Sequence, residues 1–194
     1  IFILAATLVV GVLLLWQVSK DTQATAAGYK TTWNGLAPPT AFVDAESRAA
    51  ERVADWTPDA QLFKAEATWR PPADMITVER LPVAWSFYYH SASRSKFVVV
   101  TVNGDKVFWT PPVSFAKAPA ALDDFPPTQG PEDAWLRFRE AGGEAYLRDH
   151  AAALVKYQLR ETSQGQQWTV IAITDGESLK VNVDAQTGLV IDEN

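Results

Sequence analysis

The sequence predicts an α+β protein with one transmembrane helix followed by two small domains, each a helix beside a four-stranded antiparallel sheet. Three stretches carry this prediction. Residues 1–18 are almost wholly apolar. Residues 168–192 contain three short runs of strand-forming residues separated by two turn signals, and residues 44–110 repeat the order of helix and strands more loosely. A helix across one face of a small antiparallel sheet buries the apolar side of both, which favours this architecture.

The predicted boundaries divide the chain into five parts. They are a transmembrane helix over residues 1–19, a linker over 20–43, a first domain over 44–110, a proline-rich linker over 111–131 and a second domain over 132–194. With 194 residues and 47% hydrophobic side chains, the chain can fill two small cores after a membrane segment.

The charge balance and the absence of cysteine exclude several classes of function. The formal net charge is -6, and residues 1–19 carry no charge, so the acidic excess lies in the remaining chain. An acidic surface repels nucleic acid and anionic bilayers, so we expect no nucleic-acid partner. Without cysteine there is no disulfide, thiolate nucleophile or cysteine-bound metal, although this does not identify the compartment.

The apolar segment at the start of the chain has the length of a membrane span. Eighteen residues in a helix extend roughly 27 Å, close to the hydrocarbon thickness of a bilayer. Trp16 followed by Lys20 and Asp21 is typical of a membrane interface followed by water. We therefore expect residues 1–18 to contact the lipid bilayer in a single-pass protein of the cytoplasmic membrane, with the following domains outside the cytoplasm. The alternative is a cleavable signal peptide, with a small-residue site at Ala24–Ala26.

Two segments have the composition of linkers. Residues 20–43 are rich in Thr, Ala, Gly and Pro, and they either form a spacer that folds back on the first domain or lie along a partner. Residues 111–131 contain Pro111-Pro112 and Pro126-Pro127, which is incompatible with a helix interior or a central strand. We expect this second segment to separate two domains.

The first domain is predicted to contain a helix over residues 44–56 and four strands. The apolar residues of this helix recur at helical spacing, and Asn103-Gly104 is a strong hairpin-turn signal. The strands are expected over residues 62–69, 85–90, 97–102 and 106–109.

The second domain is predicted to repeat that order. Pro131 and the acidic Glu132 and Asp133 favour the first turn of a helix, which Gly142-Gly143 interrupts. A strand over residues 154–161 precedes the three strands of residues 168–192, whose turns fall at Asp175-Gly176 and at residues 184–188.

The last hairpin resembles that of PepSY domains. Residues 181–190 read Val-Asn-Val-Asp-Ala-Gln-Thr-Gly-Leu-Val, and such domains commonly end in a valine-rich strand, Asp-Ala-x-Thr-Gly and an apolar strand. The resemblance covers residues 132–194 well and residues 44–110 weakly. It implies a cystatin-like fold and a non-catalytic extracytoplasmic role, either in restraining peptidases or as an accessory part of a membrane assembly. It supplies no catalytic residues.

The side chains that could carry chemistry do not form a recognisable site. Asp184 with Gly188 suggests a calcium loop, but the further carboxylates of such a loop are missing, so we expect turn chemistry. His90 and His150 have no metal-binding spacing, and the acidic residues at 123–124 and 132–133 flank a linker. We predict that the protein is not an enzyme, with no catalytic residue, cofactor or metal.

Aromatic side chains carry the predicted interaction surface. The chain has eight tryptophans, more than two small sheets need, so each fills a core or forms a protein interface. We expect the sheet face that no helix covers to be the docking surface. The candidate residues are Trp33, Phe87, Tyr89, Phe108 and Trp109.

These observations favour a non-catalytic, membrane-anchored accessory subunit that docks on a larger membrane protein complex of the respiratory or photosynthetic type. The expected partners are the subunits of that complex. The alternative is an extracytoplasmic binding module that restrains a peptidase or a cell-wall hydrolase.

Overall fold

The computed structural model describes residues 41–69, 82, 84–115 and 117–191, which all belong to one compact unit, Pro39–Asn194. The predicted transmembrane helix (residues 1–19) and nearly all of the first linker lie outside the described residues. Within the described ranges, no helix is long and apolar enough to cross a membrane. The expected fold class, a membrane helix followed by two small domains, is corrected to one antiparallel sheet with helices on one side. The expected localisation as a single-pass protein of the cytoplasmic membrane has no support among the described residues.

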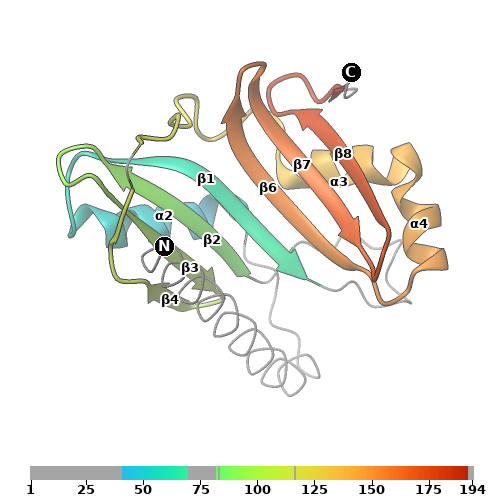
Figure 1. The fold of residues 1–194 in the computed structure, drawn as a ribbon, viewed down its shortest axis with the longest axis horizontal. Helices are drawn as coiled ribbons and strands as arrows, with labels where there is room; N and C mark the ends of the chain where they lie inside the picture. Colours follow the sequence, from blue (N-terminus) through green and yellow to red (C-terminus); the bar gives the residue numbers. More distant parts are fainter. Residues whose placement is uncertain (1–40, 70–81, 83, 116, 192–194) are drawn as a thin grey trace, which may run out of the picture. The chain divides into compact units, whose positions relative to one another are not determined.

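Nine strands form one sheet in which every neighbouring pair is antiparallel (Figure 1). The first half contributes β1 (Ala60–Trp69), β2 (Ala84–Ser91), β3 (Lys96–Asn103), β4 (Lys106–Trp109) and β5 (Val113–Ser114). The second half contributes β6 (Leu154–Thr162), β7 (Gly165–Ile173), β8 (Ser178–Asp184) and β9 (Val190–Ile191). The order across the sheet is β4-β3-β2-β1-β6-β7-β8-β9, and β5 also pairs with β3.

The prediction of two separate small domains is wrong, because β1 pairs with β6 in the middle of the sheet. The pairing runs from Lys64 opposite Arg160 to Trp69 opposite Val155. Each half alone would expose one of these strands as an edge with unpaired backbone N–H and C=O groups. Joining the two strands satisfies those groups and merges the halves.

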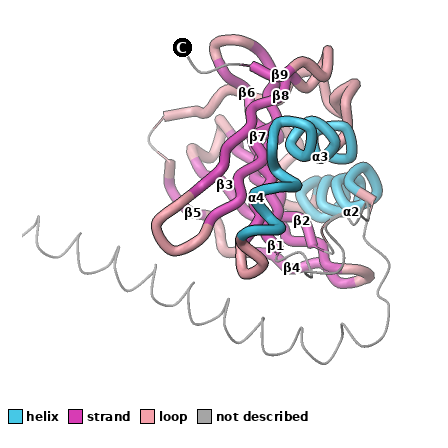
Figure 2. Tube along the Cα trace, turned by 90° about the vertical axis from the view of Figure 1, so that its right-hand side faces the viewer, coloured by secondary structure: helices cyan, strands magenta, loops and turns pink. Residues whose placement is uncertain are grey.

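Three helices lie on the same side of the sheet, which Figure 2 shows in side view. Helix α2 (Phe42–Ala54) packs on β2 and β3, and α3 (Pro131–Phe138) packs on β7 and β8. Between α3 and α4 (Glu144–Asp149) the chain kinks at Gly142, whose φ is 99°. The Gly142-Gly143 pair thus interrupts the helix where the sequence predicted it.

Large aromatic side chains fill the core where the two halves meet. Trp69 stacks on Tyr157 with ring centroids 4.7 Å apart, and Trp85 lies 6.2 Å from Trp168. Trp69, Trp85 and Trp168 are all buried. Four of the eight tryptophans, Trp69, Trp85, Trp135 and Trp168, are therefore accounted for by one continuous core that both halves share.

The proline-rich segment is part of this unit and does not act as a spacer between two domains. The backbone N–H of buried Leu122 donates to Leu62 of β1 at 2.8 Å. Gln129 accepts a 2.8 Å hydrogen bond from the indole Nε1 of Trp168 and donates its own N–H to Ala185. Proline excludes a regular element here, but the segment is fixed along its length by backbone hydrogen bonds to both halves.

Candidate protein-binding face

The side of the sheet opposite the helices, which no described helix covers, is the open face. Cross-strand partners share a face, and alternate residues of a strand face opposite ways, so the registers assign each side chain. The core residues Trp85, Phe87 and Tyr89 of β2 face the helices, and Ser86 and Tyr88 between them face the open side.

The residues predicted to form an interface lie in different environments. Trp33 lies outside the described residues. Phe87 and Tyr89 are 0% and 3% exposed under the helices, so the expectation that they line the open face does not hold. Trp109 is half-buried beside Trp56 of the helix side, with ring centroids 5.8 Å apart. Phe108 lies on the open face, as expected, and is 53% exposed.

An apolar patch occupies the open face near the edge formed by β4 and β5. Three of its side chains are strongly exposed: Phe108 at 53%, Val113 at 52% and Phe115 at 40%. Phe97 joins them, because it pairs with Val113 and its ring lies 5.4 Å from that of Phe115. The apolar patch is defined as Phe63, Phe97, Phe108, Val113 and Phe115.

A β-bulge places Phe63 in this patch. Leu62 lies opposite Tyr89 and Lys64 lies opposite Tyr88, so one extra residue is inserted between them. The ring of Phe63 turns to the open side and lies 6.0 Å from Tyr88 and 6.3 Å from Phe97. A sequence that is assumed to alternate strictly along the strand does not reveal such an insertion, so Phe63 was missed. Phe97 could have been found, because Phe97 and Val99 are two positions apart and therefore face the same side of β3.

Cationic side chains lie beside the apolar patch on β1 and β6. The ammonium groups of Lys64 and Lys156 are each 3.1 Å from the same carboxylate oxygen, Oε2 of Glu66. The hydroxyl of Tyr88 donates to the other carboxylate oxygen, and Arg160 lies directly opposite Lys64. The basic stripe is defined as Lys64, Lys156 and Arg160.

The titration behaviour of this cluster reflects its partial burial. Burial raises the pKa of Glu66, but the Tyr88 hydroxyl and the two ammonium groups outweigh it, so the net shift is downward. Burial also lowers the pKa of Lys64, and the nearby Lys156 adds to this against the opposing effect of Glu66. Glu66 is therefore ionised at neutral pH, and one carboxylate offsets only one of two ammonium charges.

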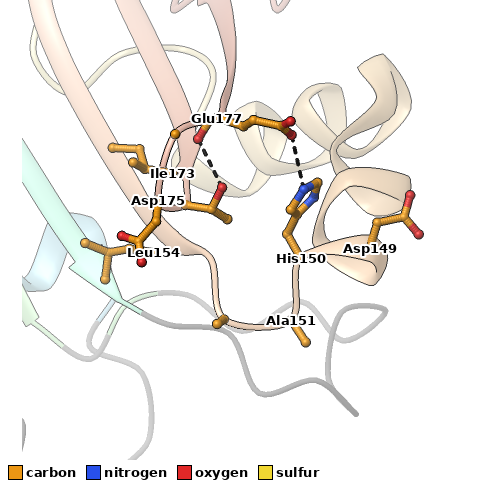
Figure 3. A pocket seen from close by; sticks show the side chains of 10 residues that line it. Asp149, His150, Ala151, Leu154, Ile173, Asp175 and Glu177 are labelled. Carbon is orange, nitrogen blue, oxygen red and sulfur yellow. Dashed lines mark hydrogen bonds and ion pairs between the residues drawn. The ribbon is translucent and has the colours of Figure 1, made fainter.

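A hollow of about 900 Å³ lies at the ends of β6 and β7 beside α4 (Figure 3). Leu154 and Ile173 line one side of it, and His150 on the other side contacts Glu177, with Nε2 3.2 Å from Oε2. The other ring nitrogen of His150 lies 2.9 Å from the carbonyl oxygen of Tyr146. Both nitrogens are thus engaged within the protein, and the contact with Glu177 ties the end of α4 to the β7–β8 turn.

The remaining candidate residues have structural roles. Asp184 Oδ1 accepts the backbone N–H groups of Gln186 at 2.9 Å and Thr187 at 2.7 Å, and Gly188 has a φ of 73°. The turn chemistry expected for this loop is confirmed. His90 lies on the open face of β2, whereas His150 lies beside the hollow. Across the part of the chain that the structure describes, no group of three or more His, Asp or Glu side chains could hold a metal ion.

Comparisons with known proteins provide no assignment. No protein-family model matches the chain, and no curated protein matches it. The resemblance to PepSY domains therefore stays a prediction. The chain is similar to the crystal structure of a "putative lipoprotein" from Clostridium difficile 630, with a TM-score of 0.48 and 11% identity over 81% of this chain and 94% of that one. A similarity at this level carries no conclusion about the present chain.

Proposed function

We propose that this chain is a non-catalytic accessory protein that binds a larger protein complex through the open face, with the apolar patch at the centre of the contact. The observation that supports this proposal is that Phe108 and Val113 are each more than half exposed on a face that no described helix covers. Exposed apolar side chains that gather on one face of a domain mark interaction sites.

The surroundings of the patch fit a protein interface. Such interfaces have an apolar, aromatic centre and a polar rim. Here the rim contains the basic stripe and the hydroxyl pair of Ser86 and Thr101, whose oxygens are 2.8 Å apart. These polar groups sit on strands held on both sides by backbone pairing, so a partner would order little on binding.

A binding role is favoured over catalysis by the internal pairing of the chemical groups. Glu66 is saturated by Tyr88 and two lysines, and His150 is held by Tyr146 and Glu177. These contacts hold neighbouring parts of the fold together, which is the ordinary role of such pairs.

The experiment is quantitative co-purification of the full-length protein from its native source in mild detergent. The wild-type chain is compared with the double variant Phe108→Ser and Val113→Ser. Leu136→Ser is the matched control, because Leu136 is 46% exposed on α3, away from the open face. We expect the double variant to lose its partner subunits and the control to keep them. An aromatic anchor at an interface contributes about 2 kcal/mol, which is roughly thirtyfold in affinity.

Retention of the same partners by the double variant would refute the proposed face. Recovery of one soluble hydrolase in place of a multi-subunit complex would instead support the alternative, in which the chain restrains a peptidase or a cell-wall enzyme.

A further inference from the structure

The open face carries the opposite charge to the chain as a whole. Among the described residues, the strand positions on this face hold more cations than carboxylates, which gives a formal charge of +3 in a protein of net charge -6. The cations are Lys64, Lys106, Lys156, Arg160 and Lys180, and the carboxylates are Glu66 and Asp184. The acidic excess therefore lies outside these strand positions.

The cations of the basic stripe lie close enough to repel one another. Lys64 and Lys156 share one carboxylate oxygen, which leaves one positive charge unbalanced. Arg160, which is exposed, lies directly opposite Lys64 on the neighbouring strand. Like charges placed opposite one another on a sheet destabilise it. An anion above these two side chains would relieve the repulsion, and the planar fork of Arg160 suits a carboxylate.

The basic stripe and the apolar patch form one continuous surface. The ammonium group of Lys64 lies 3.6 Å from the centre of the Tyr88 ring, which in turn contacts Phe63 of the patch. A ligand that covers both must therefore present negative charge next to apolar side chains.

Resting on the function proposed above, we infer that the open face recognises an acidic segment of the partner protein, whose carboxylates lie over the basic stripe and whose apolar side chains cover the apolar patch. The charge distribution selects this occupant over an anionic membrane. Charges are screened beyond about 8 Å at physiological salt, so the carboxylates of a narrow segment interact mainly with the basic stripe. A bilayer extends past the face and meets the acidic remainder of the chain.

The probe is a labelled twelve-residue peptide of alternating Glu and Phe, titrated with the full-length protein in mild detergent. Its analogues carry Gln or Lys in place of Glu, and phosphatidylserine vesicles test the membrane. We expect the Glu peptide to bind more tightly than the Gln peptide, to weaken with added salt, and to bind more tightly than the vesicles. Arg160→Gln and Lys64→Gln should each weaken it about three- to tenfold.

Arg148→Gln is the matched control, because it removes the same charge from α4 on the other side of the sheet. Arg160→Gln should leave the melting temperature unchanged or slightly higher, since it removes a like-charge pair, so weaker binding cannot be attributed to misfolding.

Equal binding of the Glu and Gln peptides, binding of neither, or tighter binding to the vesicles would overturn the inference. Failure of the inference is distinguishable from failure of the proposed function. If the native partner is lost with Phe108→Ser but kept with Arg160→Gln and at high salt, the face binds protein without reading charge. If neither substitution releases the partner, the proposed function falls as well.

Discussion

Replacing Trp69 with alanine tests whether the two halves form one cooperative unit. Trp69 ends β1 in the first half, but its ring packs on Tyr157 and on Trp135, which belong to the second. The side chain is only 9% exposed. Its removal therefore leaves a cavity between the halves, and both halves lose packing contacts.

The expected cost is large relative to the stability of a domain. Truncation of a buried tryptophan to alanine costs about 3–5 kcal/mol, which includes the lost ring contacts. A domain of this size changes its melting temperature by roughly 2–4 °C per kcal/mol, so we expect a fall of about 10 °C.

The assay is urea unfolding of the full-length protein, followed by tryptophan fluorescence and by far-ultraviolet circular dichroism. One transition with coincident midpoints is expected before and after the substitution, at lower urea for the variant. Phe108→Ala is the matched control, because that ring is 53% exposed on β4, away from the junction of the two halves, and should cost less than about 1 kcal/mol. Two separate transitions, of which only one moves, would refute the shared core, as would a loss below about 1 kcal/mol.

Two further predictions concern turns. Asp59 accepts hydrogen bonds from Ser91 Oγ at 2.8 Å and Ser93 N at 2.9 Å and from the Thr57 hydroxyl, which holds the pKa of its carboxyl far below the usual value. The stabilisation is thus complete above about pH 4 and is lost as the pH falls further, so Asp59→Asn should flatten the fall in urea midpoint between pH 4 and pH 2; an unchanged slope would contradict this. Gly188→Ala should cost about 1–3 kcal/mol by thermal unfolding, because φ is 73° and the added Cβ meets Gln129 Oε1 at 3.0 Å; an unaltered melting temperature would show that the turn relaxes freely.

Local signals in the sequence were sufficient for most of the elements, although the short strand β5, which lies in the predicted proline-rich linker, was missed. Proline and acidic residues predicted the start of α3, the glycine pair predicted its kink, and Asp-Gly and Asn-Gly predicted the turns. These features depend on residues within a few positions of each other, where backbone sterics and capping decide the conformation.

The joining of the two halves has no such local signal. The pairing of β1 with β6 depends on matching two strands far apart in the chain, and either strand alone reads as the edge of a small sheet. The excess of tryptophan was a hint, because a core shared between halves accommodates more rings, but it did not identify the partner strands. An aromatic sheet face that no helix covers could be predicted, and Phe108 lies on it. Phe63 could not be predicted there, because the bulge reverses the alternation of side-chain directions along β1.

The central strand pairing also sets the order of events during synthesis. Val155 leaves the ribosome about 90 residues after Trp69, its partner across the sheet, which at about 5–20 residues per second is a delay of roughly 5–20 s. During that interval β2 can pair with one edge of β1, but β6, the partner of the other edge, has not yet been synthesised, so the backbone N–H and C=O groups of that edge stay available. The nascent first half is consequently a template for any other extended strand, including that of a neighbouring nascent copy. Growth conditions that slow translation between these two strands should therefore lower the yield of soluble protein, and holding chaperones should restore it.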